Sequence, residues 1–211
     1  MTRTIIIRTI LGFMSVLAVL VAGLLLFVKG EPSAPGEEFA SLLKGEMAAF
    51  ALAEQKMAAP DVPFVDGEGQ IKSLEDYRGK VILLNLWATW CAPCLHEMPT
   101  LDRLKGEMAS DDFDVLAVSV DRAGVEKSRE FLGRTGAQHL DLLVDEAMRF
   151  NFAFSAYQLP TTILLGRDGI EIGRIVGVAE WDSPEVKLFL ATIIEATAER
   201  DGDQGSSGLS Q

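Results

Sequence analysis

A buried strand that runs directly into two closely spaced cysteines is the strongest constraint on how this chain folds. Residues 80–87 form an apolar run, which is typical of a central strand covered on both faces. Cys91 and Cys94 are the only two cysteines in 211 residues, and they follow at the start of a predicted helix that reaches about Ala109. A strand-to-helix turn places the first cysteine at the helix N-terminus, where free backbone N–H groups and the helix dipole favour a thiolate.

The spacing of the two cysteines predicts thiol–disulfide chemistry. Because two residues separate them, the second sulfur comes back within one helical turn of the first. The first thiolate can attack a disulfide, and the second can then displace the resulting mixed disulfide and close a two-electron cycle.

Metal binding and a purely structural bridge are the other uses of such a pair. Structural zinc needs four ligands, and His139 lies far from the pair without a partner at metal-binding spacing. Cys91, Cys94 and His96 together form a conceivable Cu(I) site, because thiolates suit that ion. A static disulfide at this spacing would close almost no loop and would constrain the unfolded chain little. We therefore favour the redox pair over these alternatives.

An apolar run of 19 residues near the N-terminus, residues 10–28, is long enough to cross a bilayer as a helix. Arg3 and Arg8 precede it, so the positive-inside rule predicts a cytoplasmic N-terminus and an exported remainder, although Lys29 weakens the charge asymmetry. The alternative is a cleaved signal peptide. The best cleavage point in the run would leave a very apolar mature N-terminus, so we favour an uncleaved anchor.

The charge of the chain narrows the choice of partners. Its formal net charge is −12, and three of its 19 basic residues precede residue 31, which leaves 16 basic against 31 acidic residues in the remainder. An acidic surface of this kind argues against nucleic acid as a partner. The absence of cysteines outside the pair fits an oxidising compartment, where stray thiols would form wrong bridges.

Composition and periodicity divide the chain into five parts. Residues 31–38 are rich in proline, glycine and glutamate, which is typical of a flexible tether. Apolar residues at three- and four-residue spacing then predict an amphipathic helix over about residues 37–56. The predicted parts are a cytoplasmic N-terminus at 1–9, the transmembrane anchor at 10–28, the tether and helix at 29–56, the main domain at 57–200 and a disordered tail at 201–211.

Alternating strand and helix patterns in residues 57–200 predict an α/β domain. Residues 62–65 and 70–74 flank the turn Asp66-Gly67-Glu68-Gly69, which predicts a β-hairpin, and Gly166-Arg167-Asp168-Gly169 predicts a second one. The other predicted elements are strands at 113–120, 140–144, 161–165 and 170–176, and helices within 124–136, near 146–152 and from Pro184 to about Arg200.

Residues 84–99, with Trp90-Cys91-Ala92-Pro93-Cys94 at their centre, resemble the active-site segment of TlpA/ResA-type thioredoxin-fold proteins. The resemblance covers about residues 57–197, and the anchor and residues 177–182 look most like the membrane-anchored TlpA branch. It implies a thioredoxin-like fold with an N-terminal β-hairpin extension and a central mixed sheet flanked by helices. Further similar strings are Ala59-Pro60-Asp61, Tyr77-Arg78-Gly79-Lys80-Val81, Ser119-Val120-Asp121 and Leu159-Pro160-Thr161-Thr162.

The resemblance also implies roles for individual residues. Cys91 would be the attacking thiolate and Cys94 the resolving thiol. Pro160 would be a cis-proline that lies across from the cysteines and leaves the backbone of Leu159 free to pair with a substrate strand. The remaining residues expected to face the substrate are Trp90, Pro93 and Thr161.

Acid–base help for Cys94 is expected from Glu97. Many thioredoxins carry a buried acidic residue six positions before the first cysteine, but here that position is Asn85, whose amide cannot titrate. Glu97 matches the acidic residue of the family's CxxCxxE pattern and lies one helical turn after Cys94. A partly desolvated carboxylate there would have a raised pKa and could receive the Cys94 proton. For Trp181 we expect a core or capping role.

Taken together, the resemblance and the predicted anchor imply a thiol–disulfide oxidoreductase in the bacterial inner membrane that faces the periplasm. We expect it to reduce client proteins with oxidised cysteines, because Ala92-Pro93 places no charge or imidazole between the sulfurs, unlike strongly oxidising active sites. Its electrons would come from a membrane-embedded thiol transporter, and its clients would be apocytochromes c or copper-site proteins of cytochrome oxidase. The redox-active disulfide would serve in place of any cofactor. The alternatives are an oxidase that donates disulfides and a non-catalytic chaperone that binds copper through the two cysteines.

Overall fold

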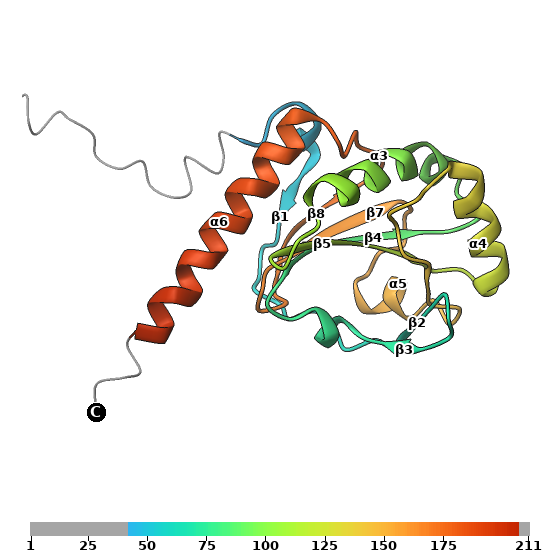
Figure 1. The fold of residues 1–211 in the computed structure, drawn as a ribbon, viewed down its shortest axis with the longest axis horizontal. Helices are drawn as coiled ribbons and strands as arrows, with labels where there is room; N and C mark the ends of the chain where they lie inside the picture. Colours follow the sequence, from blue (N-terminus) through green and yellow to red (C-terminus); the bar gives the residue numbers. More distant parts are fainter. Residues whose placement is uncertain (1–41, 207–211) are drawn as a thin grey trace, which may run out of the picture. The chain divides into compact units, whose positions relative to one another are not determined.

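The computed structural model of the protein describes residues 42–206, which form a mixed β-sheet with helices on its faces (Figure 1). The predicted anchor at residues 10–28 and the cytoplasmic N-terminus at 1–9 lie outside the described residues. Between residues 42 and 206, no helix is both long enough and apolar enough to span a bilayer.

The strand that precedes the cysteines occupies the middle of the sheet. This strand, β4 (Val81–Trp87), pairs in parallel with β5 (Phe113–Ser119) and antiparallel with β7 (Thr161–Leu165). All of its residues are buried, so the predicted central strand is confirmed. The sheet order is β1-β8-β7-β4-β5-β6-β2-β3. The other strands are β1 (Ala51–Leu52), β2 (Phe64–Asp66), β3 (Ile71–Lys72), β6 (Leu143–Val144) and β8 (Glu171–Val176).

Helices cover both faces of the sheet. In Figure 1, α3 (Ala92–Met108) lies above the strands and α5 (Arg149–Ala153) lies below them. The predicted alternation of strands and helices is confirmed, with each element within a few residues of its expected bounds. The remaining helices are α4 (Gly124–Thr135), α6 (Pro184–Ser206) and the short 3₁₀ helices η1 (Gly45–Ala49) and η2 (Leu74–Tyr77).

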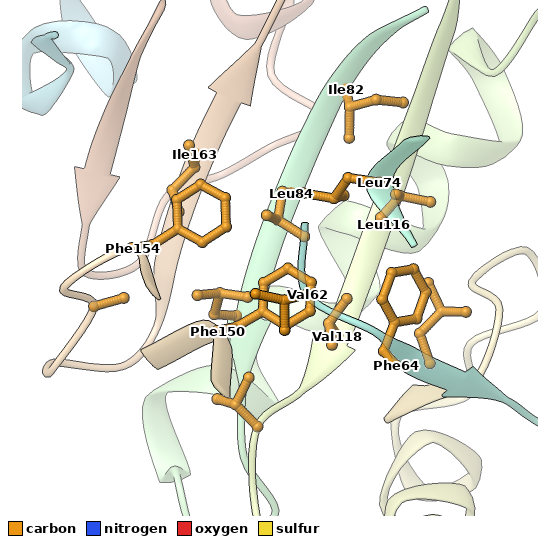
Figure 2. Close-up of a cluster of buried hydrophobic side chains, with 14 of the residues drawn as sticks. Val62, Phe64, Leu74, Ile82, Leu84, Leu116, Val118, Phe150, Phe154 and Ile163 are labelled. Atoms are coloured by element: carbon orange, nitrogen blue, oxygen red, sulfur yellow. The ribbon is translucent and has the colours of Figure 1, made fainter. Parts of the chain in front are cut away.

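Side chains of β4 point alternately to the two faces of the sheet, and this alternation divides the core. Ile82, Leu84 and Leu86 enter a hydrophobic cluster on the α5 side, where Leu84 lies near Phe150 (Figure 2). Asn85 falls between them in the sequence and therefore points to the opposite face, where α3 lies. A polar side chain is thus placed beneath the helix that carries the cysteines.

Both predicted hairpins are present. The strands β2 and β3 pair antiparallel, and the Asp66 carboxylate closes their turn by accepting hydrogen bonds from the backbone of Glu68 and Gln70. The strands β7 and β8 pair antiparallel around a turn in which Gly169 has a φ of 68°, a conformation that favours glycine. The β2–β3 pair extends the sheet through β6, so the predicted N-terminal hairpin extension is confirmed.

The amphipathic helix predicted over residues 37–56 is wrong for the part that the structure describes. Gly45 has a φ of 55°, which breaks a right-handed helix, and the chain then forms η1 and the edge strand β1, in which Ala51 pairs with Arg174. The apolar residues that produced the helical spacing are used differently. Met47 is buried in η1, and Phe50 packs edge-to-face on Phe189 of α6, with 5.0 Å between ring centroids.

The last helix is longer than the sequence pattern suggested. It was expected to end near Arg200, with a disordered tail at 201–211, but α6 continues to Ser206. No proline interrupts the backbone over these extra residues, and each added residue of a formed helix contributes another hydrogen bond. Only the last five residues of the expected tail lie outside the described chain.

Candidate active site

The two cysteines lie at the carboxyl end of β4, where the chain turns into α3. Cys91 is the N-cap of the helix, and the backbone N–H of Cys94 donates a hydrogen bond to Cys91 Sγ at 3.2 Å. A disulfide joins the two residues, whose Cα atoms are 5.3 Å apart. The structure is therefore the oxidised form, and the predicted position of the pair at the helix N-terminus is confirmed.

This position stabilises negative charge on the first sulfur once the disulfide is reduced. The first N–H groups of a helix have no partner within the helix, and its dipole places partial positive charge at the same end. Pro93, in the first turn, lacks an N–H and does not disturb the capping bond because the donor is Cys94. The Cys91 thiolate would accept that bond directly, and a hydrogen bond of this kind stabilises the charged sulfur.

Access to the two sulfurs is unequal. Cys94 is completely buried, whereas Cys91 keeps 4% of its surface exposed, so the small accessible area of the pair belongs to Cys91. Trp90 beside it is 67% exposed, and Pro93 is also exposed. An apolar surface therefore lies next to the more accessible sulfur.

Glu97 lies one helical turn after Cys94 and is almost entirely buried. Its Oε1 accepts a hydrogen bond from Asn85 Nδ2 at 2.7 Å, and its Oε2 accepts one from the indole nitrogen of Trp181 at 3.1 Å. Burial raises the pKa of Glu97 to about 7, while the hydrogen bonds from Trp181, Asn85 and the backbone of Ala179 act in the opposite direction. A carboxyl group with this pKa exchanges a proton readily at neutral pH.

The register of two central strands supplies the support beneath Glu97. Asn85 of β4 is directly opposite Thr162 of β7, and Asn85 Nδ2 donates a hydrogen bond to Thr162 Oγ1 at 2.9 Å. Both residues are buried. At the position where many thioredoxins have a titratable group, Asn85 provides an amide that holds Glu97 by a hydrogen bond. The spacing of the two residues along the chain does not reveal this contact.

The predicted cis-proline lies at the same edge of the sheet as the cysteines. The peptide bond between Leu159 and Pro160 is cis. Thr161 follows and pairs with Leu86, so the proline is level with the end of β4, from which the cysteine turn departs. Leu159 is half-buried, and the hydroxyl of the buried Thr161 donates to the carbonyl of Gln158 at 2.6 Å.

Asp121 is a structural support of the site, and the sequence named it only within a string similar to the family, without a role of its own. One of its carboxylate oxygens accepts a hydrogen bond from the backbone of Thr89 at 2.6 Å, and the other accepts one from the backbone of Ala123 at 2.5 Å. The side chain is only 2% exposed. It ties the turn before the cysteines to the turn after β5. The signal available in the sequence was an acidic residue at the end of an apolar strand.

Trp181 also has a more specific position than the core or capping role expected for it. Its side chain is buried, its backbone N–H donates to Thr100 Oγ1 at 3.2 Å, and its indole donates to Glu97. Both partners belong to α3. The loop after β8 is thereby fastened to the helix at the turn that follows the cysteines. Over residues 42–206, no group of three or more His, Cys, Asp and Glu side chains is arranged to hold a metal ion.

A cysteine pair at a helix N-terminus on a mixed sheet, with a cis-proline at the same edge of that sheet, defines a thiol–disulfide oxidoreductase with a thioredoxin-like fold. The Redoxin family profile matches residues 54–190, and the chain belongs to that family. It is a thiol–disulfide oxidoreductase of the ResA type.

Similar proteins support this assignment. The chain is 36% identical to the thiol–disulfide oxidoreductase ResA of Geobacillus kaustophilus over 120 residues, which are 56% of this chain and 66% of that protein. It is 37% identical to ResA of Geobacillus thermodenitrificans over 137 residues, 64% of this chain and 75% of that one. The crystal structure of the exposed lipoprotein thioredoxin Etrx1 of Streptococcus pneumoniae superposes with a TM-score of 0.54 at 26% identity, over 64% of this chain and 99% of that one.

Proposed function

We propose that this protein is a membrane-anchored, periplasm-facing reductant of client protein disulfides. The observation that carries the proposal is the placement of the Cys91–Cys94 pair at the N-terminus of α3, with the proton-exchanging carboxyl group of Glu97 one turn further along. Cys91 keeps a small exposed area for attack, and Cys94 is completely buried one helical turn before a group that can remove its proton.

The reaction begins with the reduced form. The Cys91 thiolate attacks one sulfur of a client disulfide, the client S–S bond breaks, and one client cysteine leaves as a thiolate. A mixed disulfide now joins Cys91 to the client. The helix N-terminus stabilises the attacking thiolate before this step, and Cys91 is the residue of the pair that keeps some exposed surface.

The second step releases the client. Cys94 gives its proton to the Glu97 carboxylate, and its thiolate attacks the Cys91 sulfur of the mixed disulfide. The second client cysteine leaves as a thiolate, so the client has gained two electrons and the Cys91–Cys94 disulfide has formed. Cys91, Cys94 and Glu97 are the proposed catalytic residues, with Pro160 as the residue that borders the exchange.

Client binding is assigned to the surface around Cys91. Trp90 and Pro93 provide exposed apolar area, and the segment of Leu159 and Thr161 lies at the same edge of the sheet. An extended client segment would pair with the backbone of Leu159 while its disulfide meets Cys91.

The proposed location is the periplasmic side of a bacterial inner membrane. The apolar run at residues 10–28 and the preceding Arg3 and Arg8 support an anchor in this orientation. The periplasm has no soluble thiol buffer, so re-reduction of the disulfide requires a membrane-embedded thiol–electron transporter. The proposed clients are cysteine pairs that must be reduced before haem attachment to cytochromes c or copper-site assembly in cytochrome oxidase.

The redox equilibrium of the full-length protein against glutathione and dithiothreitol tests the direction of the reaction. Thiol trapping and Trp fluorescence would follow the change, and a variant with both cysteines replaced by alanine would show no redox-dependent signal. A potential near or below that of thioredoxin, roughly −270 mV, supports a reductant. A potential near that of DsbA, about −120 mV, would make the protein a disulfide donor and overturn the proposal.

A further inference from the structure

The Glu97 carboxyl group is surrounded by hydrogen-bond donors. Asn85 Nδ2 donates to its Oε1 at 2.7 Å, Trp181 Nε1 donates to its Oε2 at 3.1 Å, and the backbone of Ala179 donates as well. An indole N–H and a backbone N–H can only donate. This arrangement fits the ionised carboxylate. When Glu97 takes up a proton, its new O–H needs an acceptor that these two donors cannot provide.

Asn85, the third of these residues, carries a hydrogen-bond acceptor that has no partner in the described part of the chain. The amide of Asn85 is completely buried, and its oxygen Oδ1 has no hydrogen-bond partner among the residues that the structure describes. Both amide hydrogens are occupied, by Glu97 Oε1 and by Thr162 Oγ1. A buried polar atom left without a partner destabilises the protein and calls for a functional explanation.

Half a turn about the Cβ–Cγ bond exchanges the nitrogen and oxygen of an Asn side chain. After that rotation, the Asn85 oxygen would occupy the place now held by the nitrogen, within hydrogen-bond distance of both Glu97 Oε1 and Thr162 Oγ1. A carboxylic acid O–H can donate to this oxygen. The hydroxyl of Thr162 can donate or accept, so it matches the amide in either position.

We propose that the Asn85 amide is a two-position hydrogen-bond partner of Glu97, which donates to the carboxylate and turns by half a rotation to accept from the carboxylic acid. The inference rests on the proposed role of Glu97 as the acceptor of the Cys94 proton. Asn85 acts here as a positioning residue, because it touches Glu97 and no reacting sulfur is assigned to it. An amide is suited to this position because a second carboxylate would repel ionised Glu97 and a hydrocarbon would serve neither state.

Among the groups around Glu97, the Asn85 amide is the partner that can change between donating and accepting a hydrogen bond. The residues of β4 and β7 that form its support, Asn85 and Thr162, do not titrate. On α3 the nearby titratable group is Cys94 once it is reduced. The loop after β8 carries two acidic residues, of which Asp182 is paired with Arg103 at 2.6 Å and Glu180 is exposed. The pKa of Glu97, near 7 because of burial, means that both of its protonation states are populated at neutral pH.

NMR of the full-length, isotope-labelled protein in its oxidised form tests this directly. The carbon shift of the Glu97 carboxyl group gives its titration midpoint, and an Asn85→Leu spectrum identifies the Asn85 amide signals. We expect nuclear Overhauser contacts between the Asn85 NH₂ protons and the Thr162 side chain above the midpoint and their loss below it. Contacts that persist unchanged on both sides of the midpoint would overturn the inference.

Two variants test the contact between Asn85 and Glu97 on which the switch depends. Asn85→Asp can only accept when ionised, so it should raise the midpoint of Glu97 by about one pH unit or more. The matched control is Thr162→Val, which keeps the shape of the side chain. Because the hydroxyl serves both amide positions, its loss should leave the midpoint unchanged. Because two neighbouring carboxylates repel each other whatever the role of Asn85, the rise in Asn85→Asp supports the contact, and the amide contacts in the NMR experiment decide whether the amide turns. An unchanged midpoint in Asn85→Asp would contradict the contact and refute the switch.

The proposed function can fail separately. If Glu97→Gln left the rate of mixed-disulfide resolution unchanged at every pH, Glu97 would not be the proton acceptor for Cys94. The amide contacts in the NMR experiment would still follow the protonation of Glu97 and would still support the two-position amide.

Discussion

The indole nitrogen of Trp181 lies 3.1 Å from Oε2 of Glu97, although 84 positions separate the two residues in the sequence. The bond joins the loop after β8 to the helix that carries the cysteines. It is donated to a carboxyl group in a buried setting, and such a bond favours the ionised form over the neutral one. Trp181 therefore opposes the effect of burial on the pKa of Glu97.

Replacement of this tryptophan should shift the pH dependence of the second chemical step. In Trp181→Phe, loss of the donor should raise the pKa of Glu97 by roughly one unit, because hydrogen bonds to charged groups contribute about 1.5–3 kcal/mol. The measurement is the rate at which a mixed disulfide on Cys91 is resolved between pH 5 and pH 9. Its midpoint should move upward in the variant.

Trp87→Phe is the matched control for that experiment. Trp87 is also fully buried, but its indole nitrogen has no hydrogen-bond partner in the described part of the chain, and its ring stacks on Phe131 at 4.7 Å. Its replacement alters packing and removes no donor from Glu97. Equal shifts of the midpoint in the two variants would contradict the role assigned to Trp181.

The stability of the oxidised protein should fall as the pH rises through the titration of Glu97. The pKa of this group is about 7 in the folded protein against 4.5 for an ordinary glutamate, so the folded state holds the proton more tightly. The raised pKa stabilises the folded state fully below pH 4.5. This stabilisation, at most about 3 kcal/mol in the free energy of unfolding, is lost as the pH rises to about 7. Urea denaturation at pH 5 and pH 8 measures the difference.

Glu97→Gln cannot ionise, so its free energy of unfolding should decline less between these two pH values than that of the wild type. Only the difference between the two pH values is compared, because the new amide also changes the hydrogen bonds at the site. Glu126→Gln, on the exposed side of α4, should keep the wild-type pH dependence. If the free energy of unfolding of Glu97→Gln fell between the two pH values as much as that of the wild type, groups other than Glu97 would cause the decline.

The two cysteines should behave differently when each is removed alone. Cys94→Ser, once reduced, should accumulate a mixed disulfide with an oxidised dithiol peptide, because Cys91 still attacks and nothing resolves the product. Cys91→Ser should accumulate almost none, since Cys94 has no exposed surface. Non-reducing gels and mass spectrometry measure the adduct. If both variants trapped equal amounts of the adduct, the assignment of Cys91 as the attacking cysteine and Cys94 as the resolving one would be contradicted.

The carboxylate of Asp121 should contribute substantially to the stability of the cysteine turn. Asp121→Asn replaces one acceptor by a donor that faces a backbone N–H, so we expect a loss of about 1–3 kcal/mol in the free energy of unfolding. Asp111→Asn, an exposed change before β5, should stay within about 0.5 kcal/mol of the wild type. Chemical denaturation measures both values, and similar small losses would refute the bridging role.

Elements with a strong local pattern were predictable from the sequence. The apolar run of β4, the cysteines that begin α3 and the glycine turn between β7 and β8 each carry their signal within a few neighbouring residues. Local sterics, capping and turn conformations favour such elements without the help of long-range contacts. The helix expected over residues 37–56 failed for the complementary reason. Its spacing of apolar residues was real, but β8 offered an open edge and α6 offered Phe189 as a packing partner.

The sequence alone predicts the class of reaction, whereas the tertiary structure determines the environment of the group that exchanges the proton. The spacing of Cys91 and Cys94 alone predicts disulfide exchange, because both sulfurs lie in one helical turn. The pairing of Asn85 with Thr162 depends on the register between β4 and β7, and the contact of Trp181 with Glu97 depends on where the loop after β8 meets α3. Burial and hydrogen bonds from distant segments set the pKa of a carboxyl group, so only the folded chain determines how Glu97 handles a proton.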